Sequence, residues 1–423
     1  MTTDDTAAAA SAPLSPLTGL RALDLTRLLP GPYAAQMLTE LGAETLKIEE
    51  IAGGDGGRTL APLVDGVGIG FLASNRGKRS AALNLKDADG REALLRLVER
   101  ADILLEGFRP GVVARLGLGY DTLLARNPRL VICSLTGYGQ NGPYEQRAGH
   151  DLNYLGYAGL LGHLARPGAP PPLPGPLFAD IVGGAMMSVI GVLAALVARG
   201  VTGRGQVVDV AMLDGSMAMA PTLVTPLLLG LPEAIPGAHP LTGWLPGYNI
   251  YETADGRSVT LAALEPKFWA QFCERVGRPD LIAHHTPRDA ADHDATVGEL
   301  VALFRTRTRA AWLELLADSD ACFGPVNTLA EALADPQVQA RGVIASAPEG
   351  EQGDEQGGAQ PMLRSVPLLS ATPARALGRA PRLGEHTAEA LAEVGYTPAE
   401  IAALAERRVV FTGDDAPSGA NEP

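Results

Sequence analysis

The chain has 423 residues, of which 46% are hydrophobic and 19% are charged, as in a soluble globular protein with room for two domains. Its formal net charge of −14 argues against a nucleic-acid partner and against adhesion to anionic membranes. The cysteines Cys133, Cys273 and Cys322 are far apart and lack CxxC spacing, so we expect neither a disulfide framework nor a zinc site. A reducing cytoplasm fits this pattern.

The first part of the chain has the pattern of a parallel α/β domain. Residues 1–16 contain acids and an alanine run without a basic segment before an apolar core, which predicts a disordered leader and no signal peptide. Helix-length stretches at 33–41 and 88–100 then alternate with short strand-like runs at 21–25, 45–49, 80–85, 103–108 and 130–135. This alternation predicts a mostly parallel sheet within a large domain at 17–210.

Two long apolar stretches follow. The stretch 182–198 approaches the length of a membrane span, but it contains several glycines and begins just after Asp180, so we expect a buried core helix and no membrane insertion. The stretch 207–230 suits packing or a subunit interface, and we assign 211–244 to a linker helix.

The pattern then changes to that of a smaller α+β domain at 245–335. Strand-like runs at 248–253 and 258–264 flank a turn with Asp255-Gly256, which predicts a hairpin, and Pro266 suits the first turn of a helix. Residues 336–410 return to the large domain, and 411–423 are expected to form a disordered tail.

His150 and Asp180 have the residue types of a proton-transfer site. An imidazole and a carboxylate on opposite sides of one carbon acid can remove a proton from one face and return another to the opposite face. Glu265, which also stands in an apolar setting, is a third candidate. The structural alternative is that His150 is a buried core histidine and that Asp180 is the N-cap of the helix beginning at Ile181.

Two further motifs are rejected. Gly137–Gly142 satisfies GxGxxG after a strand, but Pro143 follows and no helix does, so we expect a loop and no dinucleotide site. The histidines and aspartates between His284 and Asp294 lack regular spacing and are interpreted as a solvated surface loop. We therefore expect no metal and no redox cofactor.

Six motifs then give the chain a resemblance to a known family. These segments resemble, in order, the landmarks of the family III CoA-transferase group. They are residues 17–21, 75–80, 107–111, 136–143, 205–209 and 383–387. The resemblance implies a large Rossmann-like α/β domain with a mostly parallel sheet, a smaller α+β domain, and a homodimer of two interlocked chains. It also implies that CoA is part of the substrate and that no separate cofactor is needed.

Within the family, the chain resembles the branch that racemises the carbon next to the thioester of 2-methylacyl-CoA. The resemblance implies that His150 acts on the 2S substrate, Asp180 on the 2R substrate, and that Glu265 orients His150. The residue corresponding to Asp151 is the nucleophile in the transferase branch, where it forms an acyl anhydride. The imidazole directly before Asp151 favours the racemase, while a CoA-transferase and a catalytically silent acyl-CoA-binding protein remain the alternatives.

CoA binding is expected at the carboxyl ends of the strands, where open α/β sheets hold ligands. Lys78 and Arg79 are candidates for contacts with the CoA phosphates. The alternative is that they form a solvated basic face. The other candidate CoA-binding residues are Leu83, Asn84, Leu85, Lys86, Gly107, Phe108, Arg109, Arg115, Gly149 and Tyr154.

Overall fold

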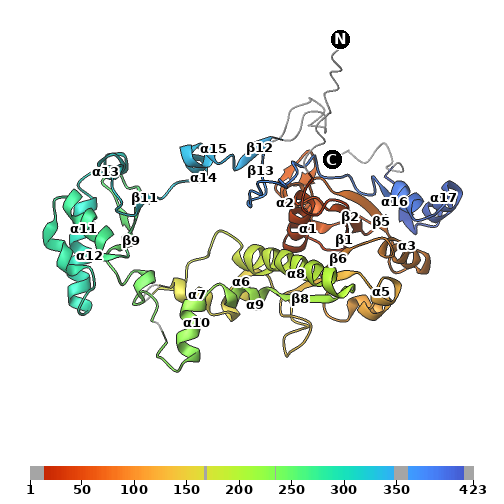
Figure 1. Ribbon diagram of the computed structural model, residues 1–423, viewed down its shortest axis with the longest axis horizontal. Coiled ribbons are helices and arrows are strands. Elements are labelled where there is room, and N and C mark those ends of the chain that lie inside the picture. The colour runs from red at the N-terminus through yellow and green to blue at the C-terminus, as the bar shows by residue number, and fades with distance from the viewer. Residues whose placement is uncertain (1–13, 166–168, 234, 347–360, 414–423) are drawn as a thin grey trace, which may run out of the picture. The chain divides into compact units, whose positions relative to one another are not determined.

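The computed structural model of the chain describes residues 14–165, 169–233, 235–346 and 361–413 (Figure 1). These residues form two compact units. The first is built from described residues of Met1–Leu155, Pro176–Met219 and Gly342–Pro423, and the second from Gly156–Gly175 and Ala220–Arg341. The described residues of 156–175 therefore pack with the second unit and not with the large domain, to which the sequence assigned them.

A seven-stranded sheet forms the centre of the first unit. Its order is β14 (Val410–Phe411), β5 (Arg79–Leu83), β2 (Glu44–Glu49), β1 (Arg21–Asp24), β6 (Ile103–Glu106), β7 (Val131–Thr136) and β8 (Val207–Ala211). All neighbouring strands pair in parallel except β14, which is antiparallel to β5. The five predicted strands and the mostly parallel sheet are confirmed, whereas β8 and β14 were not predicted.

Helices pack on both faces of this sheet. One face carries alternate strand residues such as Leu23, Leu46 and Leu104, and these form one apolar core with α3 (Ala88–Val98), α5 (Tyr120–Arg126), α16 (Thr387–Glu393) and α17 (Pro398–Glu406). The intervening strand residues point to the other face. There, α1 (Pro30–Glu40) contacts β1, β2 and β6, and α8 (Met187–Thr202) contacts β7, β8 and α1.

One continuous helical segment, Ala179–Thr202, combines the π-helical turn η2 (Ala179–Met186) with α8. Among the described residues it is the single helix that is long and apolar enough to cross a membrane, and 39% of its most apolar window is buried. Val189, Val192 and Ala195 are buried, but Ile190, Val197 and Val201 are exposed. The predicted core helix is thus buried along one face only.

The second unit contains an antiparallel sheet in the order β11 (Phe323–Pro325), β10 (Ser258–Ala262), β9 (Tyr248–Glu252). The predicted hairpin is β9–β10, and Pro266 is the first residue of α11 (Pro266–Arg275), as expected. With α12 (Ala290–Phe304) and α13 (Arg309–Leu316), these strands enclose a core whose largest buried side chains are Trp269, Phe272, Phe304 and Trp312.

Shorter elements complete the described chain. They are β3 (Leu63–Val64), β4 (Val67–Gly68), β12 (Ile344–Ser346), β13 (Pro361–Leu363), α2 (Ile69–Ser74), α4 (Val112–Arg115), α6 (Asp151–Tyr157), α7 (Leu160–Leu164), α9 (Met212–Ala218), α10 (Pro221–Leu228), α14 (Leu329–Ala334), α15 (Pro336–Ala340), and the 3₁₀ turns η1 (Gly56–Thr59), η3 (Pro240–Thr242) and η4 (Pro279–His284).

Three expectations about segment boundaries need correction. The linker 211–244 is not one helix, because α9 and α10 are separated at Ala220, and Pro221 starts a new helix where its missing N–H costs nothing. Ser15, within the predicted leader, is buried and donates to the Pro373 carbonyl at 2.8 Å. Phe411, within the predicted tail, pairs with Ala82. Residues 1–13 and 414–423 lie outside the described residues.

Candidate active site

Two aspartates that are 29 positions apart in the sequence meet in the first unit. Asp151 is the first residue of α6 and is 5% exposed. Its Oδ1 accepts a hydrogen bond from the backbone N–H of Asp180 at 3.0 Å. Asp180 stands in the first turn of the π-helical segment η2 and is half-buried. Asp151 therefore fixes the backbone from which the Asp180 carboxyl projects.

The environment of Asp180 changes its acidity. Burial and the charge of Asp151 raise the pKa of this carboxyl to about 6, against the opposing effect of His150. A carboxyl group of pKa about 6 holds and releases a proton near neutral pH, as a general acid–base group must.

His150 precedes Asp151 and is exposed, with its backbone N–H donating to Asn153 Oδ1 at 3.0 Å. Its charge acts on the Asp180 carboxyl, so the imidazole lies near the acid pair. Its exposure contradicts the interpretation of a buried core histidine. Asp180 is not an N-cap either, because its segment begins at Ala179 and Phe178 occupies the cap position. Both structural alternatives for these two residues are wrong.

Tyr154 supports the backbone that carries His150. Its hydroxyl donates to the Gly149 carbonyl at 2.6 Å, and its ring meets Tyr138 edge-on with centroids 5.2 Å apart. A Cβ at Gly149 would lie 2.8 Å from the Tyr154 ring, and one at Gly137 would lie 2.5 Å from it. Both positions therefore require glycine on steric grounds.

The electrostatic neighbours of Tyr154 connect the acid pair to the CoA candidates. Burial and the charge of Asp180 raise the pKa of the Tyr154 phenol to about 12, whereas Arg109 opposes them. Arg109 is exposed and follows the carboxyl end of β6, so its charge acts on the same site as Asp180. The structure thus brings His150, Asp151, Asp180, Tyr154 and Arg109 together.

The segment carrying Asp180 is held by close backbone contact with α9. A Cβ at Gly215 would lie 2.1 Å from the Gly183 carbonyl oxygen, so the two backbones approach more closely than any side chain at Gly215 would allow. π-Helical turns occur frequently at functional sites. The unusual turn and its tight packing set the direction in which Asp180 projects.

The remaining CoA candidates follow two strands that are not neighbours. Leu83 is buried at the end of β5, Asn84 Oδ1 accepts from the backbone of Lys86 at 3.1 Å, and Lys86 is exposed. Gly107 and Arg109 follow β6, from which β5 is separated by β2 and β1. Leu85 and Phe108 are half-buried, and Arg115 is exposed in α4. Both groups lie at the carboxyl edge of the sheet.

Lys78 and Arg79 do not form the expected phosphate site. The Lys78 ammonium is buried and donates to Asp24 Oδ2, the Pro32 carbonyl and Asn75 Oδ1 at 2.7–2.8 Å, which uses all three of its protons. Arg79 pairs with Glu389 and Glu393 at 3.3 and 2.9 Å. Both side chains are thus engaged within the fold.

No sequence motif points to the buried ion network of which Lys78 is part. Lys47 is fully buried, pairs with Asp55 at 2.9 Å and donates to the Thr26 carbonyl at 2.8 Å. Burial would raise the pKa of Asp24, but Lys47 and Lys78 outweigh it and lower that pKa to about 2. The network fixes the turn after β1.

The same turn contains Arg27, which was not among the predicted site residues. Its guanidinium lies 5.6 Å from the Phe108 ring centroid. A basic residue directly after a strand is a signal that could have identified it.

Glu265 belongs to the second unit, where it is exposed at the cap position before α11. Its side chain makes no capping hydrogen bond to that helix. Its backbone is held, since the Glu265 carbonyl accepts from the N–H groups of Phe268 and Trp269 at 3.0 and 3.2 Å. The carboxylate is therefore presented from a fixed helix terminus.

The polar segment around His284 is more regular than predicted. Asp289 caps α12 and the following acids lie within that helix, while His284 pairs with Asp292 at 2.9 Å. Within the part of the chain that the structure describes, no group of three or more His, Cys, Asp or Glu side chains is placed to hold a metal ion.

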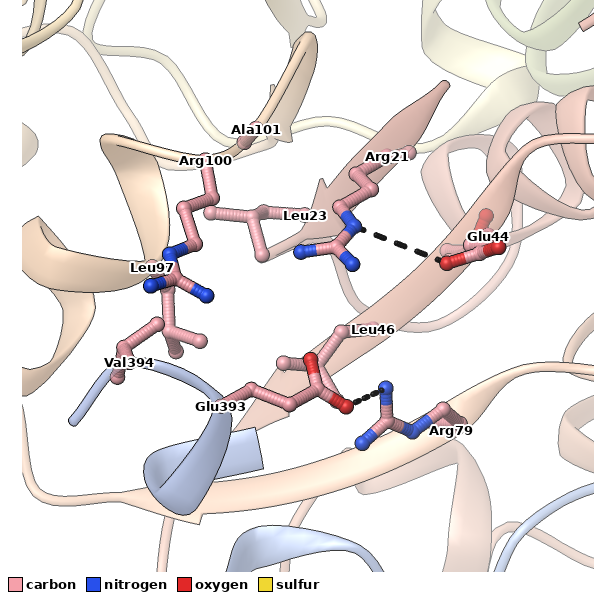
Figure 2. Close-up of a pocket in the computed structure, with 12 residues that line it drawn as sticks. Arg21, Leu23, Glu44, Leu46, Arg79, Leu97, Arg100, Ala101, Glu393 and Val394 are labelled. Atoms are coloured by element: carbon pink, nitrogen blue, oxygen red, sulfur yellow. Dashed lines mark ion pairs between the residues drawn. The ribbon is translucent and has the colours of Figure 1, made fainter. Parts of the chain in front are cut away.

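A cavity of about 40 Å³ lies at the opposite edge of the main sheet (Figure 2). Its lining includes Arg21, Glu44 and Arg79, which stand at the amino ends of β1, β2 and β5, with Leu23 and Leu46 between them. The cavity is far smaller than the roughly 300 Å³ or more of ordinary ligand pockets. It is bridged by the Arg21–Glu44 and Arg79–Glu393 ion pairs and is not the candidate active site.

The mostly parallel sheet, with the acid pair and several basic side chains after its strands, has the architecture of an α/β enzyme. The model of CoA-transferase family III matches residues 17–387, and the chain belongs to this family.

Relatives within the family have two different activities. Alpha-methylacyl-CoA racemase of Mus musculus is 37% identical over 397 residues, covering 93% of this chain and 97% of that protein. Succinate–glutarate CoA-transferase of Agrobacterium fabrum is 34% identical over 392 residues, which cover 90% of this chain and 96% of that protein. Among solved structures, a CAIB/BAIF family protein from Brucella suis has a TM-score of 0.76 at 34% identity, covering 90% of this chain and all of that chain.

Proposed function

We propose that the protein racemises 2-methylacyl-CoA thioesters by moving a proton on and off the carbon next to the thioester. The observation that carries the proposal is the division of roles within the acid pair. Asp180 is half-buried and has a pKa of about 6, whereas Asp151 is buried and hydrogen-bonded to the Asp180 backbone. His150 is exposed beside them. This arrangement supplies two proton-transfer groups and one support.

In one direction, neutral His150 accepts the α-proton through a ring nitrogen. The C–H electron pair moves into the bond between the α and carbonyl carbons, and the thioester oxygen takes the negative charge of an enolate. Asp180, in its protonated form, then delivers its proton to the opposite face and becomes a carboxylate. In the reverse direction, the Asp180 carboxylate removes the proton and the His150 imidazolium returns one. Each group contributes about 10²–10⁴-fold to the rate.

The second candidate is a CoA-transferase in which Asp151 attacks the acyl carbon and forms an anhydride. Its support is the presence of this aspartate in the site and the transferases among the relatives. Against it stand the burial of Asp151 and the hydrogen bond that its Oδ1 already accepts, since both reduce the reach and reactivity of a carboxylate nucleophile.

The test is to incubate one epimer of a 2-methylacyl-CoA in D₂O. A racemase produces the other epimer with deuterium at the α-carbon, whereas a transferase requires a carboxylate acceptor and a binding protein does neither. His150→Ala and Asp180→Asn are expected to abolish epimer formation with little change in CoA affinity, because acid–base groups act mainly on the transition state. Asp121→Asn, at an exposed position of α5, is the matched control. Near-normal epimerisation by either active-site variant would refute the assignment.

Glu265 is proposed to orient the His150 imidazole, as a carboxylate does for histidines in other sites. Arg109, Arg115, Lys86 and Asn84 are proposed to hold CoA at the carboxyl edge of the sheet. Glu265→Gln keeps the size of the side chain but removes its charge, so we expect lower turnover with unchanged CoA affinity.

We further propose a homodimer of interlocked chains in the cytoplasm. The exposed apolar side chains Val197 and Val201 of α8 and Leu228 of α10 suit burial against a second copy. The three cysteines are free, which fits a reducing compartment. Interlocked chains cannot separate without unfolding, so sedimentation at decreasing concentration is expected to show a dimer throughout. A monomer at low concentration would overturn this proposal.

A further inference from the structure

Glu106, a residue that no motif singled out, lies directly before the turn that carries Arg109. It is the last residue of β6, its side chain is 1% exposed, and its Oε2 accepts the backbone N–H of Phe108 at 2.8 Å. That hydrogen bond closes over Gly107 and sets the path of the chain from β6 into Arg109. A buried acid thus fixes the start of the turn.

The other hydrogen bonds of Glu106 come from one helix and one neighbouring strand. The Tyr120 hydroxyl of α5 donates to Oε1 at 2.7 Å, and the buried Ser134 hydroxyl of β7, opposite Glu106 in the sheet register, also hydrogen-bonds to this carboxylate. Burial raises the pKa of Glu106, and these donors and the Phe108 N–H act against that rise. Three donors therefore converge on one carboxylate.

Ser134 extends the network to the loop that leads to His150. Gln140 Nε2 donates to Ser134 Oγ at 2.8 Å, and the Gln140 backbone N–H donates to Asp209 Oδ2 at 3.2 Å. Asp209 lies opposite Ser134 in the register of β7 with β8. Oriented hydrogen bonds thus run from the loop at Gln140, through Ser134, to the turn at Phe108.

We infer that Glu106 is a positioning residue for CoA binding, which it serves by holding the Gly107–Arg109 turn in register with the loop that carries Gln140. Arg109 contacts the ligand, and Glu106 acts through it. The inference rests on the CoA-binding part of the proposed function, and it holds for racemisation and for acyl transfer alike, because both require CoA in the same place.

The chemistry of the three donors predicts which substitutions are tolerated. In Glu106→Gln, the amide oxygen can still accept from the Phe108 N–H, and the Tyr120 and Ser134 hydroxyls can rotate to accept from the amide NH₂. Glu106→Ala leaves the Phe108 N–H buried without an acceptor, which frees the turn. We therefore expect Glu106→Gln to retain most of the CoA affinity and Glu106→Ala to lose about tenfold.

The decisive experiment is a double-mutant cycle on CoA binding, measured by calorimetry with CoA itself on the full chain. Arg109→Ala is expected to weaken binding by about tenfold or more, since it removes a charge-assisted contact. If Glu106 acts through Arg109, Glu106→Ala causes no further loss in the Arg109→Ala background. Glu40→Ala, which truncates another buried acid in α1, is the control expected to leave CoA binding unchanged.

The outcomes separate the two proposals. Fully additive losses in the cycle overturn the positioning role of Glu106, whereas failure of the unaltered protein to bind CoA overturns the proposed function itself. If Glu106→Ala does not fold, the same cycle is run with Tyr120→Phe, which removes one donor to the carboxylate. A smaller loss that disappears in the Arg109→Ala background supports the inference, and an additive one overturns it.

Discussion

Replacing Asp151 by asparagine provides a quantitative test of the acid pair. When Asp180 acts as the base its carboxyl must be ionised, so the rate in this direction falls at low pH, where the carboxyl is protonated. With a pKa of about 6, Asp180 is protonated in about one molecule in ten at pH 7. At the ordinary pKa of 3.8, Asp180 would be protonated in about one molecule in a thousand at pH 7. The raised pKa thus enlarges the acid form by about a hundredfold.

Asp151→Asn removes the like charge that helps to raise this pKa, and its side-chain oxygen still accepts from the Asp180 N–H. The pKa of Asp180 must then fall, so the acidic limb of kcat/KM shifts to lower pH. For the unaltered protein the limb is expected near pH 6, with about one tenth of the plateau rate left at pH 5. The variant is expected to retain a larger fraction of its own plateau at pH 5.

The assay is the pH dependence of α-proton exchange for both proteins with the same substrate. Titration of the substrate phosphates is then common to both curves, and the difference between the midpoints reports the enzyme alone. An acidic limb of the unaltered protein that lies below pH 5, or a limb that moves upward in Asp151→Asn, would refute the reasoning.

Three further changes test the surrounding framework. Lys47→Met leaves the buried Asp55 carboxylate without its cation and takes one of two cations from Asp24, so it should lower the free energy of unfolding by about 3–5 kcal/mol in denaturant titrations, with exposed Lys86→Met as the control. Gly149→Ala places a methyl group 2.8 Å from an aromatic ring and should abolish exchange, whereas Gly200→Ala meets open space and should not. Because Asp24 has a folded pKa of about 2, below its ordinary 3.8, its contribution to stability is present above pH 4 and should be lost between about pH 4 and 2 in acid unfolding followed by circular dichroism.

The sequence predicted the main sheet because its strands are short apolar runs bounded by helix-length segments. It missed β8, since Val207–Ala211 runs directly into the apolar helix α9 with no turn residue between them. It missed β14 because two residues carry no periodicity and depend on pairing with β5 for their structure. Propensity could not supply either strand, because tertiary contact decides both.

The buried ions show a stricter limit. A lysine inside a strand is ordinarily assigned to the surface, yet Lys47 is fully buried with Asp24 and Asp55 as partners. These partners come from separate segments, so nothing local in the sequence identifies the network. For the same reason the sequence indicates either a phosphate contact or a solvated basic face for Lys78, whereas the fold places it in the interior.

The candidate site was predictable in its residue types but not in its division of labour. His150, Asp151 and Asp180 could be selected from their motif and their apolar surroundings, but a Pro- and Gly-rich connection separates the two acids. Only the fold shows that Asp151 accepts the Asp180 backbone N–H. That contact is the basis on which we propose one of the two activities of the family for this chain. An anhydride requires Asp151 to leave its hydrogen bond and reach the acyl carbon, which would release the backbone of Asp180. Proton transfer requires Asp151 to stay where it is. We therefore propose that the arrangement which holds Asp180 in place for racemisation also withdraws Asp151 from acyl transfer.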